Sequence, residues 1–361
     1  MRVAILGSRG IPANYGGFET FAEELSVRLV QQGIDVTVYC EGSHDNRDTY
    51  KSVTRVFRTV PQLGAGGRLL FDVKCLWDAR HKYDVVYMLG YGAGLFCFIP
   101  RIWGTQVWIN MDGVEWARPK WSWLARVWLK MMEAVAMWTP NRIVADAEAI
   151  KLNLAQRYSR MPTYSVIPYG AHLVNTPPPV SVLDEWSVEP YGYYLVVCRL
   201  VPENHLREII EGYIASLSML PLLVVGNRQS GTQYVNDLLA LTNERVRFVG
   251  TVYNQNKLQA LRCYSRAYFH GHSMGGTNPS LLEAMGCGNV IIAHENPFNR
   301  EVAGEAATYF SSAQDIPALL EKLDADEAET LRMKGAAKNR VATTYTWDAI
   351  VKAYLDLINH G

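Results

Sequence analysis

Residues 267–288 read Ala-Tyr-Phe-His-Gly-His-Ser-Met-Gly-Gly-Thr-Asn-Pro-Ser-Leu-Leu-Glu-Ala-Met-Gly-Cys-Gly. The apolar start predicts a short strand at 267–270, and Gly275-Gly276 predicts a turn. A helix is expected to begin near Pro279, because proline is favoured in the first turn of a helix. Backbone N–H groups at such a helix start can bind an anion. This strand, turn and helix predict an α/β domain with a phosphate-binding loop.

The same alternation of short apolar runs and helical patterns extends over the whole chain. Strands are expected at residues 3–6, 35–39, 84–89, 105–110, 142–145 and 164–167, and again at 194–198, 222–225, 246–249, 267–270 and 290–293. Apolar strands that alternate with helices predict a parallel sheet covered by helices on both faces. Pro177-Pro178-Pro179 interrupt the pattern and predict a linker.

We therefore predict an α/β protein with two Rossmann-like, doubly wound domains that face a central cleft. The N-terminal domain is expected at residues 1–172, the linker at 173–190 and the C-terminal domain at 191–344. The helix pattern at the end of the chain, residues 345–361, is expected to cross back onto the first domain. Ligands of such sheets bind beyond the carboxyl ends of the strands.

Composition excludes several classes of protein. The 361 residues are 49% apolar and contain 35 Lys and Arg against 35 Asp and Glu, which argues against disorder and against a nucleic-acid-coating protein. The balance is uneven, because residues 1–172 hold 20 basic against 15 acidic side chains. Six scattered cysteines without a C-x-x-C pair predict reduced thiols. With neither a signal peptide nor a membrane-spanning run expected, we predict a cytoplasmic protein.

A glycine-rich loop follows the first expected strand. It reads Gly-Ser-Arg-Gly-Ile-Pro-Ala-Asn-Tyr-Gly-Gly-Phe-Glu-Thr over residues 7–20 and favours a phosphate-facing loop over an ordinary turn. Its spacing is neither that of a dinucleotide-binding motif nor that of a P-loop. A second cluster, Gly90-Tyr91-Gly92-Ala93-Gly94, favours a structural turn.

Two carboxylates follow the strand expected at 105–110. Asp112 and Glu115 are candidates for orienting an acceptor hydroxyl or stabilising positive charge at a reacting carbon. The alternative is pairing with Arg118 and Lys120. In the second half, Arg199 ends a strand, where its planar guanidinium suits a diphosphate, although a surface pair with Glu203 is the simpler interpretation.

Glu283 and the neighbouring histidines complete the set of candidates. Glu283 lies inside an otherwise apolar helix and therefore needs a partner or a ligand, such as ribose hydroxyls. His270 and His272 lack a third ligand nearby, so no zinc site is predicted.

These segments together resemble the family-4 retaining glycosyltransferases of the GT-B fold, over nearly the whole chain. The loop at residues 7–20 is similar to a bacterial subgroup described as rhamnosyltransferases of capsule and exopolysaccharide assembly. The resemblance implies transfer of a hexosyl or deoxyhexosyl group from a nucleoside-diphosphate sugar to a hydroxyl of a glycan or lipid-linked oligosaccharide. It implies retained configuration and no cofactor or bound metal. UDP-glucose is the expected donor, with dTDP-L-rhamnose as the alternative.

The resemblance also assigns roles to residues. Asp112, Arg199 and Glu115 are the expected catalytic residues. The donor would contact Gly16, Gly17, Arg199, Asn204, His205, Gly226, Asn227, Val252, Tyr253, Gly276, Thr277, Asn278, Pro279, Ser280, Leu281 and Glu283. Three positions depart from the family pattern. Gly275 replaces the first Glu of the E-x7-E motif, Asn204 or His205 stands where the family has a lysine, and Asp112 stands where many members carry histidine.

Arg199 and the loop Gly276–Ser280 are expected to stabilise the leaving diphosphate while the acceptor attacks on the same face. Two other classes of function stay open, a nucleotide-sugar epimerase and a non-catalytic nucleotide-sugar-binding protein.

Tryptophan is concentrated in one segment. Seven of the ten tryptophans lie between Trp103 and Trp138, and residues 119–138 predict an amphipathic helix. Trp121, Leu124, Ala125, Trp128, Met132 and Val135 are expected on one face. This face either packs on the sheet or lies in a membrane interface, where Trp121–Trp138 would bring the enzyme to the inner face of the membrane and a lipid-linked acceptor.

Overall fold

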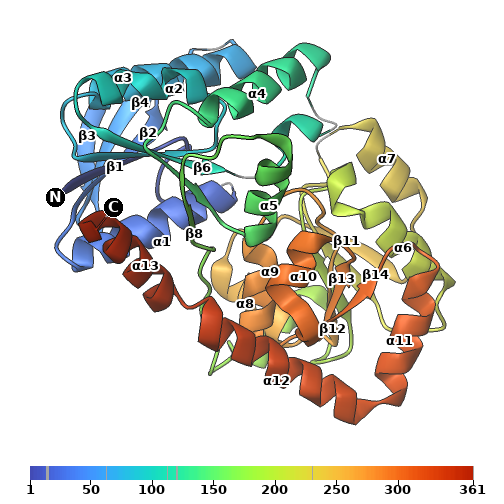
Figure 1. Ribbon diagram of the computed structural model, residues 1–361. Helices are drawn as coiled ribbons and strands as arrows, with labels where there is room; N and C mark the ends of the chain where they lie inside the picture. Colours follow the sequence, from blue (N-terminus) through green and yellow to red (C-terminus); the bar gives the residue numbers. More distant parts are fainter. Residues whose placement is uncertain (14–15, 62, 112, 119–120, 230, 361) are drawn as a thin grey trace. The chain divides into compact units, whose positions relative to one another are not determined.

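The computed structural model describes residues 1–13, 16–61, 63–111, 113–118, 121–229 and 231–360 (Figure 1). The chain forms two compact units. Unit 1 contains Met1–Tyr169 together with Trp347–Gly361, and unit 2 contains Gly170–Thr346. Among the described residues, no helix combines the length and the apolar character needed to cross a membrane.

Unit 1 is built on an eight-stranded sheet in the order β3-β4-β2-β1-β5-β6-β7-β8. Its strands are β1 (Arg2–Leu6), β2 (Asp35–Gly42), β3 (Asn46–Tyr50), β4 (Val53–Thr59), β5 (Val85–Leu89), β6 (Gln106–Met111), β7 (Arg142–Ala145) and β8 (Thr163–Val166). All neighbours pair in parallel except β3 and β4. The sequence analysis missed this antiparallel edge, because the exposed β3 lacks apolar alternation and its turn uses Lys51 and Ser52 at positive φ in place of glycine.

Helices cover both faces of this sheet. They are α1 (Gly17–Gln31), α2 (Ala65–Ala79), α3 (Phe98–Ile102), α4 (Trp123–Ala136), α5 (Glu148–Arg157) and α13 (Trp347–His360), with short 3-10 turns η1 (Gly94–Cys97) and η2 (Glu115–Ala117). Figure 1 shows α2, α3 and α4 on one face and α1 and α13 on the other. The last helix of the chain therefore belongs to unit 1, where the Tyr354 hydroxyl lies 2.9 Å from that of Tyr87 on β5.

The orientation of α4 differs from the prediction. Its buried residues are Leu129, Met132, Glu133 and Ala136, whereas Leu124, which was predicted to share a face with Met132, is 63% exposed. The helix begins at Trp123, after the N-cap Ser122. A charged residue, Glu133, faces inward because three neighbouring side chains donate hydrogen bonds to its carboxylate, a long-range arrangement that helical periodicity does not reveal.

Unit 2 contains a fully parallel six-stranded sheet in the order β11-β10-β9-β12-β13-β14. Its strands are β9 (Tyr194–Val197), β10 (Leu222–Val225), β11 (Val246–Gly250), β12 (Ala267–His270), β13 (Ile291–His294) and β14 (Ala307–Phe310). The strand order reverses between β9 and β12. In open α/β sheets ligands bind at this reversal, beyond the carboxyl ends of the two strands.

The helices of unit 2 are α6 (Leu206–Ala215), α7 (Gln233–Ala240), α8 (Gln255–Cys263), α9 (Pro279–Cys287), α10 (Pro297–Ala303), α11 (Asp315–Ala325) and α12 (Glu327–Thr344), with 3-10 turns η3 (Val180–Trp186), η4 (Pro202–Asn204) and η5 (Gly304–Ala306). Residues 173–190, predicted as a linker, include η3, whose Leu183 is buried. The Tyr264 hydroxyl donates to the carbonyl of Pro178 at 2.7 Å, which ties this segment to unit 2.

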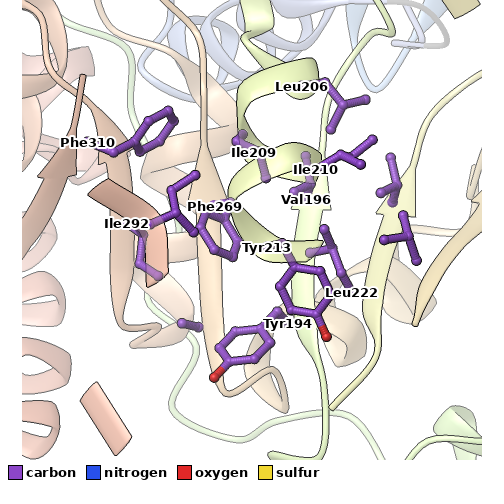
Figure 2. Packing of buried hydrophobic residues seen from close by; sticks show 14 of the residues in the cluster. Tyr194, Val196, Leu206, Ile209, Ile210, Tyr213, Leu222, Phe269, Ile292 and Phe310 are labelled. Carbon is purple, nitrogen blue, oxygen red and sulfur yellow. The ribbon is translucent and has the colours of Figure 1, made fainter. Parts of the chain in front are cut away.

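An aromatic layer holds β9 and β12 together. Tyr194, Tyr213 and Phe269 are fully buried, and the rings of Tyr213 and Phe269 lie 5.8 and 6.1 Å from the ring of Tyr194 (Figure 2). Burial of each such side chain contributes about 1.5–3 kcal/mol. This packing joins β9, β12 and α6 into one core beneath the carboxyl edge of the sheet.

Candidate functional site

The loops that follow β9 and β12 are in direct contact at the reversal of strand order. The backbone N–H of Ser273 donates to the carbonyl oxygen of Glu203 at 3.1 Å. A Cβ atom on Gly271 would lie 1.9 Å from the carbonyl oxygen of Asn204, so only glycine allows this approach. The two loops therefore form one surface at the carboxyl edge of the sheet.

Asn204 and His205 fasten these loops to each other. The buried Asn204 amide donates to the carbonyl of Arg199 at 2.7 Å, and its oxygen lies 2.8 Å from Nδ1 of His272. His205 places Nε2 at 3.0 Å from the Ser273 hydroxyl and Nδ1 at 3.1 Å from Glu208. Both were predicted to contact the donor, and both have their polar atoms engaged within the protein.

Burial keeps two histidines of this region, His270 and His294, in their neutral form. The ring of His294 stacks on that of His205, with centroids 3.9 Å apart. Burial, followed by the neighbouring His205, lowers the pKa of His294 to about 4. Burial likewise lowers the pKa of His270 to about 3. Neither ring therefore supplies positive charge to this edge of the sheet at neutral pH.

Arg199 supplies that charge. Its side chain is exposed, two residues after the end of β9, and it forms no ion pair with any residue that the structure describes. The alternative interpretation, a surface pair with Glu203, is not observed, because Glu203 is buried. A second exposed guanidinium, Arg228, follows β10, the neighbour of β9 in the sheet. The sequence analysis missed Arg228, although Gly226-Asn227-Arg228 at a strand end was a usable signal.

The amide groups before α9 provide further donors. Within the described part of the chain, no hydrogen bond takes up the backbone N–H of Gly275, Gly276 or Asn278. In the first turn of α9, by contrast, the amide groups have partners. The N–H of Ser280 donates to the Asn278 side-chain oxygen at 2.9 Å. The expected anion donors at the helix start are therefore already bonded, and the free amides lie one step earlier, in the Gly275–Asn278 loop.

The side chains of Ser280 and Leu281 face the protein interior. The Ser280 hydroxyl lies 2.6 Å from that of Tyr268 and donates to the carbonyl of Val197 at 3.2 Å. Leu281 is fully buried, and its N–H donates to Asn278. Thr277 is buried as well, and Pro279 begins α9. These residues shape the loop rather than offering side chains to a ligand.

Glu283 has a protein partner that the sequence did not reveal. Its carboxylate lies 2.5 Å from the guanidinium of Arg262, the residue before the end of α8. Arg262 is almost wholly buried, whereas the Glu283 side chain is 37% exposed. The ion pair satisfies one carboxylate oxygen and holds Glu283 in place. The other oxygen accepts no hydrogen bond from the described residues and is available to hydroxyl groups.

Two further loops lie at the same edge of the sheet. The N–H of Gly226, after β10, donates to the carbonyl of Gly250, at the end of β11, at 2.9 Å. A Cβ on Gly226 would approach the carbonyl oxygen of Cys198 to 2.5 Å, so this loop also packs against the end of β9. Asn227 is exposed, Val252 is partly exposed, and Tyr253 is 76% exposed. Their contact with the donor stays a prediction.

The glycine-rich loop of unit 1 is bound by the protein's own carboxylates. Glu19 on α1 accepts the N–H of Arg9 at 2.8 Å, and Glu23 accepts that of Ala13 at the same distance. Glu19 is nearly buried, next to Gly16 and Gly17 at the helix start. A second anion placed here would meet a carboxylate, which disfavours a diphosphate at this loop.

The acidic segment after β6 is likewise paired. Glu115 accepts a hydrogen bond from the Trp121 indole at 3.0 Å, and its other oxygen lies 2.5 Å from the guanidinium of the buried Arg118. The alternative interpretation of Glu115, pairing with Arg118, is what the structure contains. Asp112 lies outside the described residues. In the described part of the chain, no group of three or more His, Cys, Asp or Glu side chains is arranged to hold a metal ion.

Two family models match separate parts of the chain. Residues 1–172 match a family model described as a domain of unknown function, DUF1972, and residues 207–356 match one described as glycosyl transferase-like. None of the curated protein sequences matches the chain.

Solved structures match over the full length. Sucrose-phosphate synthase from Thermosynechococcus elongatus superposes with a TM-score of 0.83 at 14% identity, covering 99% of this chain and 98% of that one. Anabaena HepE in complex with UDP-glucose gives a TM-score of 0.80 at 16% identity, covering 99% of both chains. The trehalose-6-phosphate synthase OtsA gives 0.79 at 11% identity, covering 100% and 99%. Residues 207–356 thus resemble a glycosyl transferase-like domain, and the chain has the GT-B fold of these structures.

Proposed function

We propose that this chain is a glycosyltransferase whose nucleoside-diphosphate sugar binds at the carboxyl edge of unit 2. One observation carries the proposal. The unpaired guanidinium of Arg199 and the free amides of Gly275, Gly276 and Asn278 follow the two strands at which the sheet order reverses. Cationic and amide donors at this position match the charge and the oxygen atoms of a diphosphate.

The remaining parts of a nucleotide fit the neighbouring residues. Glu283, held by Arg262, presents one free carboxylate oxygen to the ribose hydroxyls. The exposed Asn227, Val252 and Tyr253 lie in loops suited to the base. Structures of similar fold contain UDP, UDP with glucose, or UDP-glucose, which favours UDP-glucose as the first donor to test. The resemblance of the loop at residues 7–20 makes dTDP-L-rhamnose the second.

The chemistry that we propose is retaining transfer without a bound metal. Negative charge builds on the diphosphate as the bond to the sugar breaks, and Arg199 with the loop amides stabilises it. The acceptor hydroxyl, on a glycan or lipid-linked oligosaccharide, attacks the same face and gives its proton to the departing phosphate. Asp112 positions the sugar or the acceptor. Such a reaction would serve polysaccharide biosynthesis.

Incubation of the full chain with labelled nucleotide sugars and a glycolipid extract tests the proposal. A panel of UDP-glucose, other UDP-hexoses and dTDP-L-rhamnose, first ranked by thermal shift, selects the donor. A new glycoside that forms equally in the presence of EDTA is the expected product. Release of an epimerised nucleotide sugar without acceptor would assign an epimerase. Binding of donors without any product would assign a non-catalytic protein.

A further inference from the structure

One surface of unit 1 exposes an unusual number of large apolar side chains. Nine of them lie between residues 95 and 138, each at least 39% exposed: Leu95, Phe98, Ile102, Trp103, Trp123, Leu124, Val127, Met131 and Trp138. They belong to η1, α3 and α4 with their flanking residues. Trp123 is 72% exposed, although burying a tryptophan is strongly favourable. Exposed apolar groups in such number mark an interaction site.

The contacts between these elements make the surface continuous. The Arg101 guanidinium, on α3, donates to the carbonyl of Thr139 at 2.6 Å, just beyond α4. The Thr139 hydroxyl in turn donates to the carbonyl of Gly94, in η1, at 2.8 Å. The Trp128 indole donates to the carbonyl of Gly92 at 3.1 Å. Figure 1 shows α3 and α4 on the same face of the sheet. We call the nine side chains and their supporting elements the apolar face.

The opposite side of α4 is firmly anchored, so its exposed side is not the result of loose packing. Glu133 has no exposed side-chain surface and accepts hydrogen bonds from the Trp116 indole at 3.0 Å and the Tyr158 hydroxyl at 2.7 Å. Arg157 adds a charge-assisted bond at 3.2 Å. A buried carboxylate with this many donors fixes the rotation of the helix. Trp123, Leu124, Val127 and Met131 are therefore held outward.

The exposed charges on η1, α3 and α4 are all positive. Arg101, Arg126 and Lys130 are exposed among the members of the apolar face. The stretch from Val85 to Met111 contains no acidic residue, and Glu133, the acid of α4, is buried. Arginine also stacks on two tryptophans at the ends of the surface. Arg160 lies 4.0 Å from the Trp138 ring centroid, and Arg80 lies 5.6 Å from that of Trp103.

We propose that the apolar face docks onto the surface of an anionic lipid bilayer. Tryptophan, leucine and methionine would enter the interface between headgroups and acyl chains, where indole rings are favoured. Arg101, Arg126 and Lys130 would meet the anionic headgroups. The docking does not depend on the proposed reaction and is measured without donor or acceptor.

Flotation of the full chain with phosphatidylcholine vesicles, with and without phosphatidylglycerol, tests this proposal. We expect binding only to the anionic vesicles, weakening as salt is added. The double variant Trp123→Ser/Leu124→Ser should lower the affinity by about tenfold or more, because its side chains supply much of the inserted apolar surface. Arg126→Glu/Lys130→Glu should lower it at least fivefold for each cation removed, roughly the effect of one basic residue at such a surface.

Matched controls lie on unit 2 and on α13. Leu217 and Met219 are 94% and 83% exposed, so Leu217→Ser/Met219→Ser removes comparable apolar surface away from the apolar face. Lys352→Glu reverses an exposed charge on α13. Both should bind vesicles like the unaltered chain, and all variants should keep its thermal unfolding midpoint. Failure of the unaltered chain to float on anionic vesicles, or equal losses in the controls, would overturn the proposal.

Sedimentation velocity provides the remaining arm of the experiment. A chain that dimerises without binding vesicles, and becomes monomeric in Trp123→Ser/Leu124→Ser, would assign the apolar face to a second copy of the chain. That result would also overturn docking on lipid. A monomeric chain that floats on anionic vesicles supports it.

Discussion

The two units present opposite electrostatics at the loops that follow their central strands. In unit 1, the loop after β1 and the segment after β6 are occupied by the protein's own carboxylates, Glu19 and Glu115, each bonded to neighbouring groups. In unit 2, the loops after β9 and β12 bind each other through Asn204 and Ser273. Within the described parts of the chain, the Arg199 side chain and three loop amides have no partner.

This difference shows that a glycine-rich loop alone does not make an anion site. Both units have a parallel sheet, a glycine-containing loop and a helix after it. In unit 1 the helix brings a glutamate to the loop amides. In unit 2 the Asn278 side chain binds the helix amide, and no described residue accepts the N–H of Gly275, Gly276 or Asn278. The diphosphate is therefore expected on unit 2, and each of the following predictions tests that assignment.

The largest effect is expected from Arg199→Ala. Loss of a two-pronged, charge-assisted contact should raise the dissociation constant for UDP about a hundredfold, because each such bond contributes about 1.5–3 kcal/mol. Isothermal titration calorimetry on the full chain measures it. Arg207→Ala removes an exposed arginine that pairs with Glu211 on α6 and should leave the affinity unchanged. Equal affinity in Arg199→Ala would move the diphosphate away from this edge.

Glu283→Gln separates the ribose contact from the diphosphate contact. UDP affinity should fall about tenfold, since one charge-assisted bond is weakened, while the affinity for inorganic pyrophosphate should stay the same. The unfolding free energy should also fall by about 1–2 kcal/mol, because the buried Arg262 loses its charged partner. Parallel loss of UDP and pyrophosphate binding would argue that Glu283 only supports the loop.

Glu19→Gln tests whether the glycine-rich loop of unit 1 is closed to a diphosphate. It weakens the bond to the N–H of Arg9 and should lower the unfolding free energy by about 1 kcal/mol, as measured by urea denaturation. UDP affinity should not change. A marked gain in affinity would mean that the carboxylate competes with a diphosphate at the loop of unit 1, which is the arrangement that we reject.

His270→Gln tests the neutral state of a buried histidine behind the site. The pKa of His270 is about 3 in the folded chain, far below the ordinary value of 6.5. Below about pH 6.5 the unfolded chain therefore binds a proton that the folded chain does not, and stability falls as the pH falls. His270→Gln should reduce this slope by up to about 1.4 kcal/mol per pH unit between about pH 6 and pH 5. An unchanged slope in urea denaturation curves would contradict the buried neutral state.

Turn-forming and helix-capping residues made parts of the fold predictable from the sequence. The predicted strand at 267–270 and the helix beginning near Pro279 match β12 and α9, because glycine, asparagine and proline act on the residues beside them. The edge strand β3 escaped prediction, since a polar strand at a sheet edge has no apolar period. The rotation of α4 about its axis was also not predicted. It depends on Glu133, which is buried because Trp116 and Tyr158, both distant in sequence, donate hydrogen bonds to it.

The position of the candidate site was predictable from the sequence. Which of its side chains face a ligand and which bond within the protein was not. Arg199, the Gly275–Asn278 loop and Glu283 lie at one edge, as strand order requires. The sequence does not show that Asn204, His205 and Ser280 direct their polar atoms into the protein. Arg262 is brought to Glu283 only by the packing of α8 against α9, so no spacing rule connects the two residues.

Hydrogen exchange measured by mass spectrometry, with and without saturating UDP-glucose, tests the central claim most directly. We predict slower exchange in peptides that cover 199–205 and 271–283, where the amides of Gly275, Gly276 and Asn278 would bind the diphosphate. Exchange in the peptide that covers Ser8–Ala13 should not change, because its amides at Arg9 and Ala13 are already bonded to Glu19 and Glu23. Protection confined to the loop of unit 1, with none at 271–283, would contradict the assignment of the donor site to unit 2.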